Sequence, residues 1–428
     1  MLRLRHIPLR YRLPLIHRGL SALAQWRSKT WVKAPDAELR KGDFIVSGFF
    51  NESLGIGQGG RLSARAFRRA GYATMERDLR PAFRHLVDRK ASLPGDGGVW
   101  YIHANPAELL VALLTLPPGR WANRYRIGYW AWETPKAPAS WVFAADYLHE
   151  IWVPSAFVQE ALAKTFTEAG REDLIVRIRI MPHPVTTPVL RARSEIEAMR
   201  HAFGLEPGRC EVLALFDTKS SAARKNPWGS IDAWTRAFPV PTDAARLTLK
   251  VNDLEADRDS RQRLEAVVLA RPDIQLVSDR LSEASMEVFF ASFDVLLSLH
   301  RSEGFGLPLA EAMAVGVPVI ATGWSGNLAF MTAKNARLIP AGLVRIDDID
   351  GPYTGLESDP DQVWGDPDID SAAKALRDLT KSASARTKLG QKGRQVVDGL
   401  HKPWRADVLS SLPFNGWLRA TANPPLRK

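Results

Sequence analysis

Residues 300–311 read HRSEGFGLPLAE, and this stretch decides the fold. Two glutamates, Glu303 and Glu311, lie eight positions apart on either side of a Gly-Phe-Gly turn. The apolar run at 293–299 predicts a buried strand before the turn, and LPLAEAMA predicts a helix after it. A strand, a glycine-rich turn and a helix in this order aim backbone N–H groups and the positive end of the helix dipole at one point. That point suits an anion, whereas a carboxylate in the helix would repel a phosphate and accept hydrogen bonds from sugar hydroxyls.

Working outward, strands alternate with helices along most of the chain, which predicts an α/β fold with parallel sheets and right-handed crossovers. We expect two doubly wound, Rossmann-like domains at 42–190 and 191–400, with ligands at the carboxyl ends of the strands and the site in a cleft between the domains. A glycine-rich loop is expected at 51–60. The expected strands are 43–50, 99–103, 125–132, 150–154, 176–181, 212–216, 247–251, 274–277, 293–299, 317–321 and 336–339.

Composition narrows the class of protein. The 428 residues suffice for two globular domains, and no apolar run is long enough and free enough of charge to predict a spanning helix. The single cysteine, Cys210, excludes an internal disulfide and a cysteine-based metal cluster, and it fits a reducing cytoplasm. Two Asp-x-Asp patterns, at 257–259 and 366–370, fall in polar stretches away from strand ends, so we expect neither a metal nor another cofactor.

The positive charge gathers at the N-terminus. The net charge is +11, and residues 1–29 contain seven Lys or Arg and no acid, interleaved with Leu, Ile and Trp26. Residues 1–29, the first part of a basic N-terminal arm at 1–41, favour docking on an anionic membrane surface. A disordered tail is the alternative, and Pro8 and Pro14 argue against one continuous helix. We expect no nucleic-acid partner, because the positive charge does not extend over the rest of the chain.

The run from Glu303 to Thr322, EGFGLPLAEAMAVGVPVIAT, closely resembles the signature of retaining glycosyltransferases of the GT-B fold, in the group called family 4. A strand ending in Ser precedes it and a turn at 323–327 follows it, as in that family. A second run, GYWAWE followed by EIWVPSAF, resembles bacterial polysaccharide glycosyltransferases. The resemblance implies transfer of a sugar from a nucleotide diphosphate sugar to a glycan or lipid-linked acceptor, in cell-surface polysaccharide assembly at the cytoplasmic face of the membrane. It also implies that the tail, 401–428, packs on the N-terminal domain.

The resemblance implies roles for residues of the second domain. Glu303 would contact the donor sugar and Glu311 the ribose, and no side-chain nucleophile is needed, because the leaving diphosphate takes the acceptor proton. Positive groups beside that diphosphate would lower the barrier most. Lys225 matches the family's lysine, and either Arg224 or Lys219 takes the place of its arginine; a solvated loop is the alternative. The backbone that would hold hydroxyls and phosphate belongs to Gly304, Phe305, Gly306 and Leu307.

In the first domain the resemblance points to the ends of two strands. Gly57, in GIGQGG, would allow close approach to a phosphate, although a dinucleotide site could have a similar loop. His103 would contact the donor sugar, or else satisfy a backbone carbonyl at the strand end. Asn105 shares that position. Trp132 and Glu133 are candidate acceptor contacts because aromatic faces stack on sugar rings, and they are as often core residues.

Two other functions remain open at this point. A nucleotide-sugar epimerase on the same fold would need further acid or base groups, and the sequence indicates no such set. A non-catalytic scaffold that binds nucleotide or glycan would not need the intact set of Glu303, Glu311, Lys225 and His103.

Overall fold

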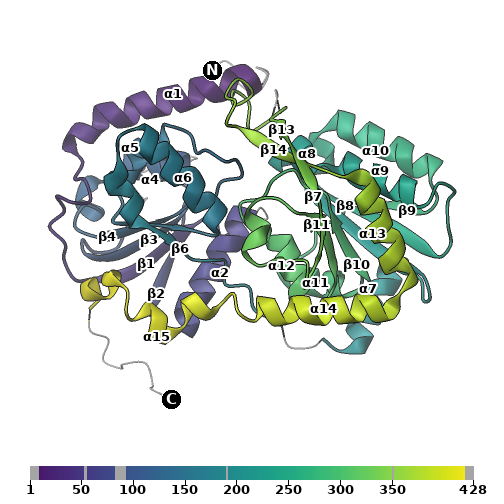
Figure 1. Cartoon of the computed structure of the whole chain (residues 1–428). Coiled ribbons are helices and arrows are strands. Elements are labelled where there is room, and N and C mark those ends of the chain that lie inside the picture. The colour runs from purple at the N-terminus through teal and green to yellow at the C-terminus, as the bar shows by residue number, and fades with distance from the viewer. Residues whose placement is uncertain (1–8, 53–54, 82–92, 189–190, 349–350, 420–428) are drawn as a thin grey trace. The chain divides into compact units, whose positions relative to one another are not determined.

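A computed structural model describes residues 9–52, 55–81, 93–188, 191–348 and 351–419. Residues 1–8, which begin the predicted basic arm, lie outside this description. Contacts divide the chain into two compact units (Figure 1). We call Tyr11–Pro184 together with the segment from His401 unit 1, and Val185–Leu400 unit 2.

Unit 1 contains a six-stranded, wholly parallel sheet in the order β2-β1-β3-β4-β5-β6. The chain leaves β1 for β2 at one edge and returns to β3 on the other side of β1. The carboxyl ends of β1 and β3 therefore flank a topological switch point, where doubly wound sheets bind ligands. The strands are β1 (Asp43–Gly48), β2 (Thr74–Asp78), β3 (Gly98–His103), β4 (Tyr125–Tyr129), β5 (Glu150–Val153) and β6 (Ile178–Ile180).

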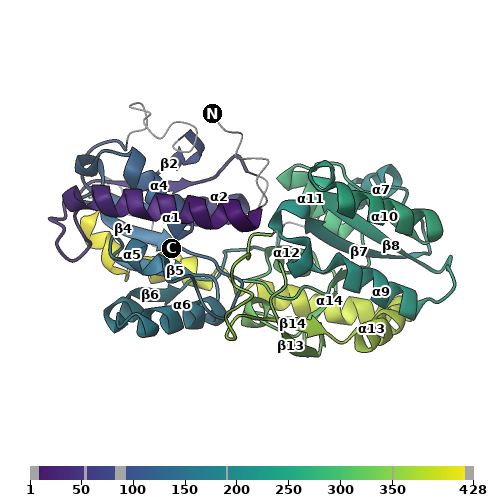
Figure 2. The same cartoon turned by 90° about the horizontal axis from the view of Figure 1, so that it is seen from above.

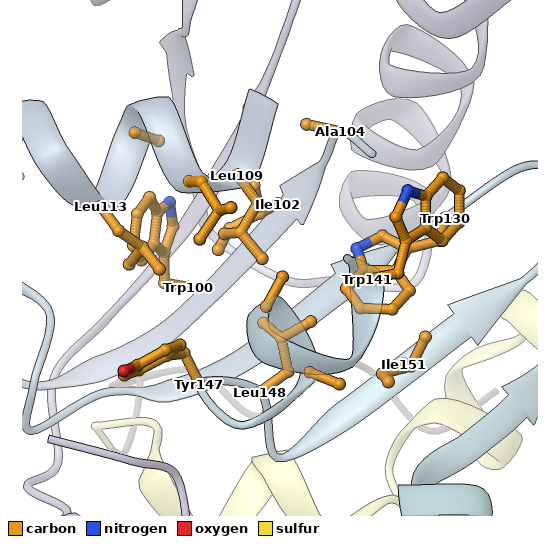
Figure 3. Close-up of a cluster of buried hydrophobic side chains, with 14 of the residues drawn as sticks. Trp100, Ile102, Ala104, Leu109, Leu113, Trp130, Trp141, Tyr147, Leu148 and Ile151 are labelled. Atoms are coloured by element: carbon orange, nitrogen blue, oxygen red, sulfur yellow. The ribbon is translucent and has the colours of Figure 1, made fainter. Parts of the chain in front are cut away.

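Each face of this sheet has its own core. Alternate strand residues such as Trp100 and Ile102 face a cluster shared with α4, α5 and α6 (Figure 3). The other alternate residues of β3, Val99 and Tyr101, face α2 and the C-terminal segment. Two buried faces explain why these strands are apolar throughout rather than alternating. The helices are α2 (Gly55–Arg69), α4 (Pro106–Thr115), α5 (Trp141–Ala145) and α6 (Ala156–Glu168).

The segment from His401 packs on unit 1. Trp404 and Phe414 are buried in the α2-side core, and Phe414 lies 5.5 Å from the ring of Phe44. The Trp404 indole donates a hydrogen bond to the carbonyl of Pro182 (2.7 Å). A bridge between Gly42 and Leu418 follows α15 (Ala406–Leu409).

The N-terminal segment differs from its prediction. Helix α1 (Leu9–Arg27) runs through Pro14 without a break, whereas the prolines argued against a continuous helix. Pro14 is the sixth residue of α1, so it removes the N–H that would bond the carbonyl of Arg10, and the helix nevertheless continues after it. Ala24 and Leu20 of α1 pack on the core that contains α4 and α5 (Figure 2).

Unit 2 repeats the doubly wound plan. Its parallel sheet has the order β12-β11-β10-β7-β8-β9, so the chain runs outward through β8 and β9 and returns to β10 beside β7. The switch point lies between the carboxyl ends of β7 and β10. The strands are β7 (Cys210–Asp217), β8 (Ala245–Asn252), β9 (Ile274–Val277), β10 (Val295–Ser298), β11 (Val319–Thr322) and β12 (Arg337–Ile339).

Helices cover this second sheet, and an antiparallel hairpin of β13 (Ala341–Arg345) and β14 (Val363–Pro367) follows it. The hairpin was not predicted, because its residues show neither an apolar alternation nor a two-residue turn signal. The helices are α7 (Arg193–Ala202), α8 (Ala222–Lys225), α9 (Pro227–Ala237), α10 (Arg258–Ala270), α11 (Glu283–Ala291), α12 (Leu307–Ala314), α13 (Ile369–Lys381) and α14 (Ala383–Val397).

The α/β class with two doubly wound domains is confirmed, and the structure has a strand that overlaps each predicted range. The predicted glycine-rich loop at 51–60 is wrong in its second half, because α2 begins at Gly55. We predicted a loop because glycine has a low helix propensity. Close packing at the start of α2 requires residues without a side chain, and this requirement outweighs the propensity. Strand β2 was missed because its residues, TMERD, are mostly polar at a sheet edge.

Candidate functional site

In unit 2, the segments after β7 and β10 bring three of the predicted residues together. The Nζ atom of Lys225 lies 2.5 Å from Oε1 of Glu303, and Nη1 of Arg224 lies 3.4 Å from the same oxygen. The side chains of Arg224 and Glu303 are 5% and 11% exposed, so the pairing is largely shielded from water. Two cationic side chains thus meet at the one carboxylate that both contact, and cationic side chains are groups that bind anions.

The charge state of Glu303 follows from these neighbours. Burial raises the pKa of the Glu303 carboxyl, but Lys225, Arg224 and His300 outweigh burial and hold that pKa at about 2. Glu303 is therefore ionised at neutral pH and is a weak base. It can accept hydrogen bonds from hydroxyls and stabilise nearby positive charge.

Backbone geometry fixes Arg224 and Lys225 in this place. Arg224 donates hydrogen bonds to the carbonyls of Ser302 (2.8 Å) and Ser220 (3.1 Å). The bond to Ser302 joins the segment after β7 to the segment after β10. Ser221 has a positive φ, and its hydroxyl accepts the Arg224 N–H at the start of α8. Asn226 is also left-handed and caps α9 through Gly229. Lys219 lies in a short 3-10 turn before α8, and its side chain lies outside the described atoms.

The Gly-Phe-Gly turn is held by the segment after β11. The N–H of Glu303 donates to Oγ of Ser325 (2.8 Å), and the N–H of Gly326 donates to the carbonyl of Glu303 (2.7 Å). A Cβ at Gly326 would lie 2.0 Å from the carbonyl oxygen of Gly304, so only glycine fits there. Gly306 caps α12 with a φ of +90°. The turn therefore presents the first backbone N–H groups of α12 in a fixed geometry.

Three other predicted residues in this stretch differ in how deeply they are buried. Phe305 is buried, with its ring 4.9 Å from that of Phe330, so its side chain anchors the turn in the core. Glu311 lies half-buried one turn into α12, between the buried residues Ala310 and Ala312. Leu307, the first residue of α12, is buried as well.

His300, which lies three residues before Glu303, was not predicted as a site residue. His300 is fully buried, with Nε2 3.2 Å from Oδ1 of Asn327 and Nδ1 3.1 Å from Oγ of Ser298. Burial lowers the pKa of His300, although Glu303 acts in the opposite direction. His300 thus links the end of β10 to the turn at Asn327. His300 is the first residue of the stretch at 300–311, and this position is the feature of the sequence from which it could have been predicted.

Unit 1 has a second cluster, around His103 at the end of β3. The His103 ring stacks on Tyr129 at 4.4 Å, and His183 lies 5.7 Å from it. Burial lowers the pKa of His103 well below its usual range and that of His183 to about 3, so both imidazoles are neutral at neutral pH. His183 was not predicted, since only the fold brings the end of β6 to the end of β3. A neutral imidazole here can donate and accept hydrogen bonds but carries no charge.

The glycines of α2 lie against this cluster. A Cβ at Gly59 would lie 2.6 Å from Nε2 of His103 and 2.7 Å from Cε1 of His183, so the backbone of α2 covers both rings. A Cβ at Gly57, the predicted glycine, would lie 2.4 Å from the carbonyl oxygen of Glu52. Gly57 is therefore needed for the tight entry into α2, and Gly59 is the glycine beside His103.

The predicted acceptor-side residues lie after β3 and β4. Asn105 precedes α4, and its Oδ1 accepts the N–H of Ala131 (2.9 Å), which ties the two loops together. Trp132 is half-buried, packs 5.0 Å from Trp141 and donates to the carbonyl of Lys136. Glu133 is half-buried beside it. Trp132 is thus partly a core residue, and Glu133 lies in the same loop.

Comparison with known proteins agrees with this architecture. The glycosyltransferase from Rickettsia africae superposes with a TM-score of 0.60 at 12% identity, covering 87% of this chain and 100% of that one. Anabaena HepE, solved with UDP and glucose, gives 0.57 at 14% identity, over 86% and 100% of the two chains. The chain has the GT-B fold. Within it, residues 246–346 match the family model described as glycosyl transferases group 1. No curated protein matches the sequence.

The same fold occurs in the N-terminal domain of Candida albicans trehalose-6-phosphate phosphatase, with a TM-score of 0.53 at 11% identity over 78% of this chain and 74% of that one. In the described part of the GT-B chain, no group of three or more His, Cys, Asp or Glu side chains is placed to hold a metal ion. Among the described helices, none is long and apolar enough to cross a bilayer.

Proposed function

We propose that this protein is a retaining glycosyltransferase of family 4, which transfers a sugar from a nucleotide diphosphate sugar to a glycan or lipid-linked acceptor without a metal. The observation that carries the proposal is the buried pairing of Glu303 with Lys225 and Arg224 at the switch point of unit 2. The match of residues 246–346 to group 1 glycosyl transferases supports it, because that stretch includes both Glu303 and Glu311.

The proposed chemistry follows the charges. When the bond between the sugar and the diphosphate breaks, negative charge develops on the leaving diphosphate. Lys225 and Arg224 would stabilise that charge, as would the backbone N–H groups from Gly304 to Leu307 at the start of α12. These groups would neutralise the charge without a metal. The acceptor oxygen forms its bond to the sugar from the face that the diphosphate leaves, and a diphosphate oxygen takes the acceptor proton.

Glu303 fits a binding role rather than a nucleophilic one. Its pKa of about 2 and its two cationic neighbours make the carboxylate a weak base and a weak nucleophile. We assign it to the hydroxyls of the donor sugar and Glu311 to the ribose. This division requires no covalent intermediate on the protein.

In unit 1, the neutral imidazole of His103 would hydrogen-bond a sugar hydroxyl. We assign Asn105, Trp132 and Glu133 to the acceptor, with Gly57 shaping the start of α2. Anabaena HepE is described in complex with UDP and glucose, which supports a uridine diphosphate sugar as a donor to test first. We place the reaction in cell-surface polysaccharide assembly, at the cytoplasmic face of the membrane.

The test is nucleotide release from UDP-, GDP-, dTDP- and ADP-sugars, with membrane lipid extract as acceptor source and a chelator present. We expect one donor to turn over, Glu303→Ala to lose turnover, and the exposed-site control Glu287→Gln to retain it. Full turnover by Glu303→Ala would remove that residue from the mechanism. Conversion of the donor to its epimer without nucleotide release would favour an epimerase, and tight binding of a donor without any reaction would favour a scaffold.

A further inference from the structure

Helix α1 presents an unusual outer surface. One side of the helix is anchored, because Ala24 is fully buried and Leu20 packs on the core of unit 1. The opposite side of a helix anchored in this way is normally polar. In α1 it is largely apolar instead, and the exposed apolar residues are Tyr11, Leu15, Ile16, Leu23 and Trp26.

The largest of these residues form one stripe. Leu15 is 62% exposed and Trp26 is 64% exposed, and helical geometry places positions 15 and 26 nearly in line. Tyr11 precedes Leu15 by one turn, on the same side. Leu23 and Ile16 widen the stripe on one flank. A contiguous exposed apolar surface of this kind marks an interaction site rather than ordinary solvent exposure.

Positive charge borders the stripe. Residues 9–30 contain five Lys or Arg and no acid. Arg18, one turn from Leu15 and two from Trp26, is exposed on one edge of the stripe, and Arg27 is exposed on the other side. The surface therefore combines apolar and aromatic side chains with cations: Arg12 lies one turn before Leu15 and Ile16, and Arg18 and Arg27 lie at its edges. This is the pattern of helices that lie in the plane of an anionic membrane.

We propose that α1 docks unit 1 on an anionic lipid bilayer. Leu15 and Trp26 enter the headgroup region, where the amphipathic Trp ring is favoured, and the flanking arginines bind lipid phosphates. A nucleic acid would use the cations but leave the apolar stripe exposed to water. A second copy of this chain would bring the same edge arginines, Arg18 and Arg27, into the contact, and like charges repel. The lipid surface satisfies both features, and this inference does not rest on the proposed transferase activity.

The test is co-sedimentation of the full chain with phosphatidylcholine vesicles and with equimolar phosphatidylcholine–phosphatidylglycerol vesicles. We expect binding to the anionic vesicles alone, weakened by added salt. The double variant Leu15→Ser, Trp26→Ser should lower the partition coefficient by about tenfold or more. Arg18→Gln with Arg27→Gln should lower it by on the order of tenfold to a hundredfold.

A matched control is Val176→Ser with Leu269→Ser, which removes two apolar residues that are 86% and 89% exposed elsewhere on the chain. This control should bind vesicles like the parent. Equal binding to neutral vesicles, an equal loss in the control, or retention of binding by the stripe variant would each overturn the proposal. Self-association or RNA binding that disappears in the stripe variant, in the absence of vesicle binding, would also overturn it. Nucleotide-sugar turnover with a water-soluble acceptor, measured in parallel, tests the proposed function separately.

Discussion

The buried carboxylate of Glu303 makes a definite prediction about stability and pH. Its pKa is about 2 in the folded protein, against an ordinary value of 4.5. One pKa unit corresponds to about 1.4 kcal/mol, so the ionised carboxylate stabilises the fold by about 3 kcal/mol at neutral pH. The Glu303→Gln variant removes this contribution and leaves the shape of the side chain almost unchanged.

The sign of the pH dependence follows from the direction of the shift. Because the folded pKa is depressed, the stabilisation is present above the ordinary pKa of 4.5 and is lost as the pH falls toward 2. At about pH 3 roughly 1.4 kcal/mol remains. The difference in unfolding free energy between the wild-type protein and Glu303→Gln should therefore narrow by about 2 kcal/mol between about pH 7 and about pH 3.

The assay is urea unfolding of the full chain at both pH values. Hydrogen exchange in peptides of β7 and α9 is the readout, so that the unfolding of unit 2 is measured by itself. Leaving Lys225 and Arg224 beside a neutral amide adds a cost that is nearly the same at both pH values and cancels in the comparison. Glu287→Gln, at an exposed pair with Arg191, should change little at either pH. A difference for Glu303→Gln that stays constant with pH would refute the assigned charge state.

Three further substitutions test the packing around the two clusters. Gly59→Ala forces a methyl group against the buried rings of His103 and His183, so turnover should fall by on the order of a hundredfold and unit 1 should lose about 1–3 kcal/mol of stability; unchanged turnover would separate His103 from catalysis. Gly326→Ala places a Cβ against the carbonyl of Gly304 and should destabilise unit 2 by about 1–3 kcal/mol in urea unfolding. Phe414→Ala empties a buried site beneath β1 and should cost unit 1 about 3–5 kcal/mol, whereas a cost below about 1 kcal/mol would show that the tail is not part of that core.

Local patterns were enough to predict the architecture. Apolar runs of strand length alternated with helical periods, and both sheets buried their two faces, so the strands stood out clearly. The stretch from Glu303 to Glu311 placed a strand, a turn and a helix in the order that the structure shows. The closeness of Arg224 and Lys225 to Glu303 follows from the predicted parallel sheet as well, because neighbouring parallel strands end at the same edge of the sheet.

Contacts between distant segments could not be predicted in the same way. His183 stands three residues after β6, and nothing local relates it to His103 or Gly59. Asn327, whose Oδ1 lies 3.2 Å from Nε2 of His300, belongs to the turn at 323–327, and the resemblance of that turn to the family signature did not show which side chain it meets. In both cases one polar side chain meets another only after the sheet has formed, so the sequence carried no periodic signal for the pairing.

The prediction that Pro14 would interrupt an N-terminal helix was wrong. A proline within a helix removes one backbone hydrogen bond and crowds the carbonyl four residues before it, and α1 continues through Pro14 in spite of this cost. The continuous α1 that results is what gives the exposed stripe its alignment.

The measurement that tests the central claim most directly is calorimetric titration of UDP, GDP, dTDP and ADP into the wild-type protein and Lys225→Met. We predict that one of these diphosphates binds and that its affinity falls by about tenfold to a hundredfold in Lys225→Met, because one charge-assisted hydrogen bond is worth about 1.5–3 kcal/mol. Binding that is the same in both proteins, or no binding of any diphosphate to the folded wild-type protein, would contradict it.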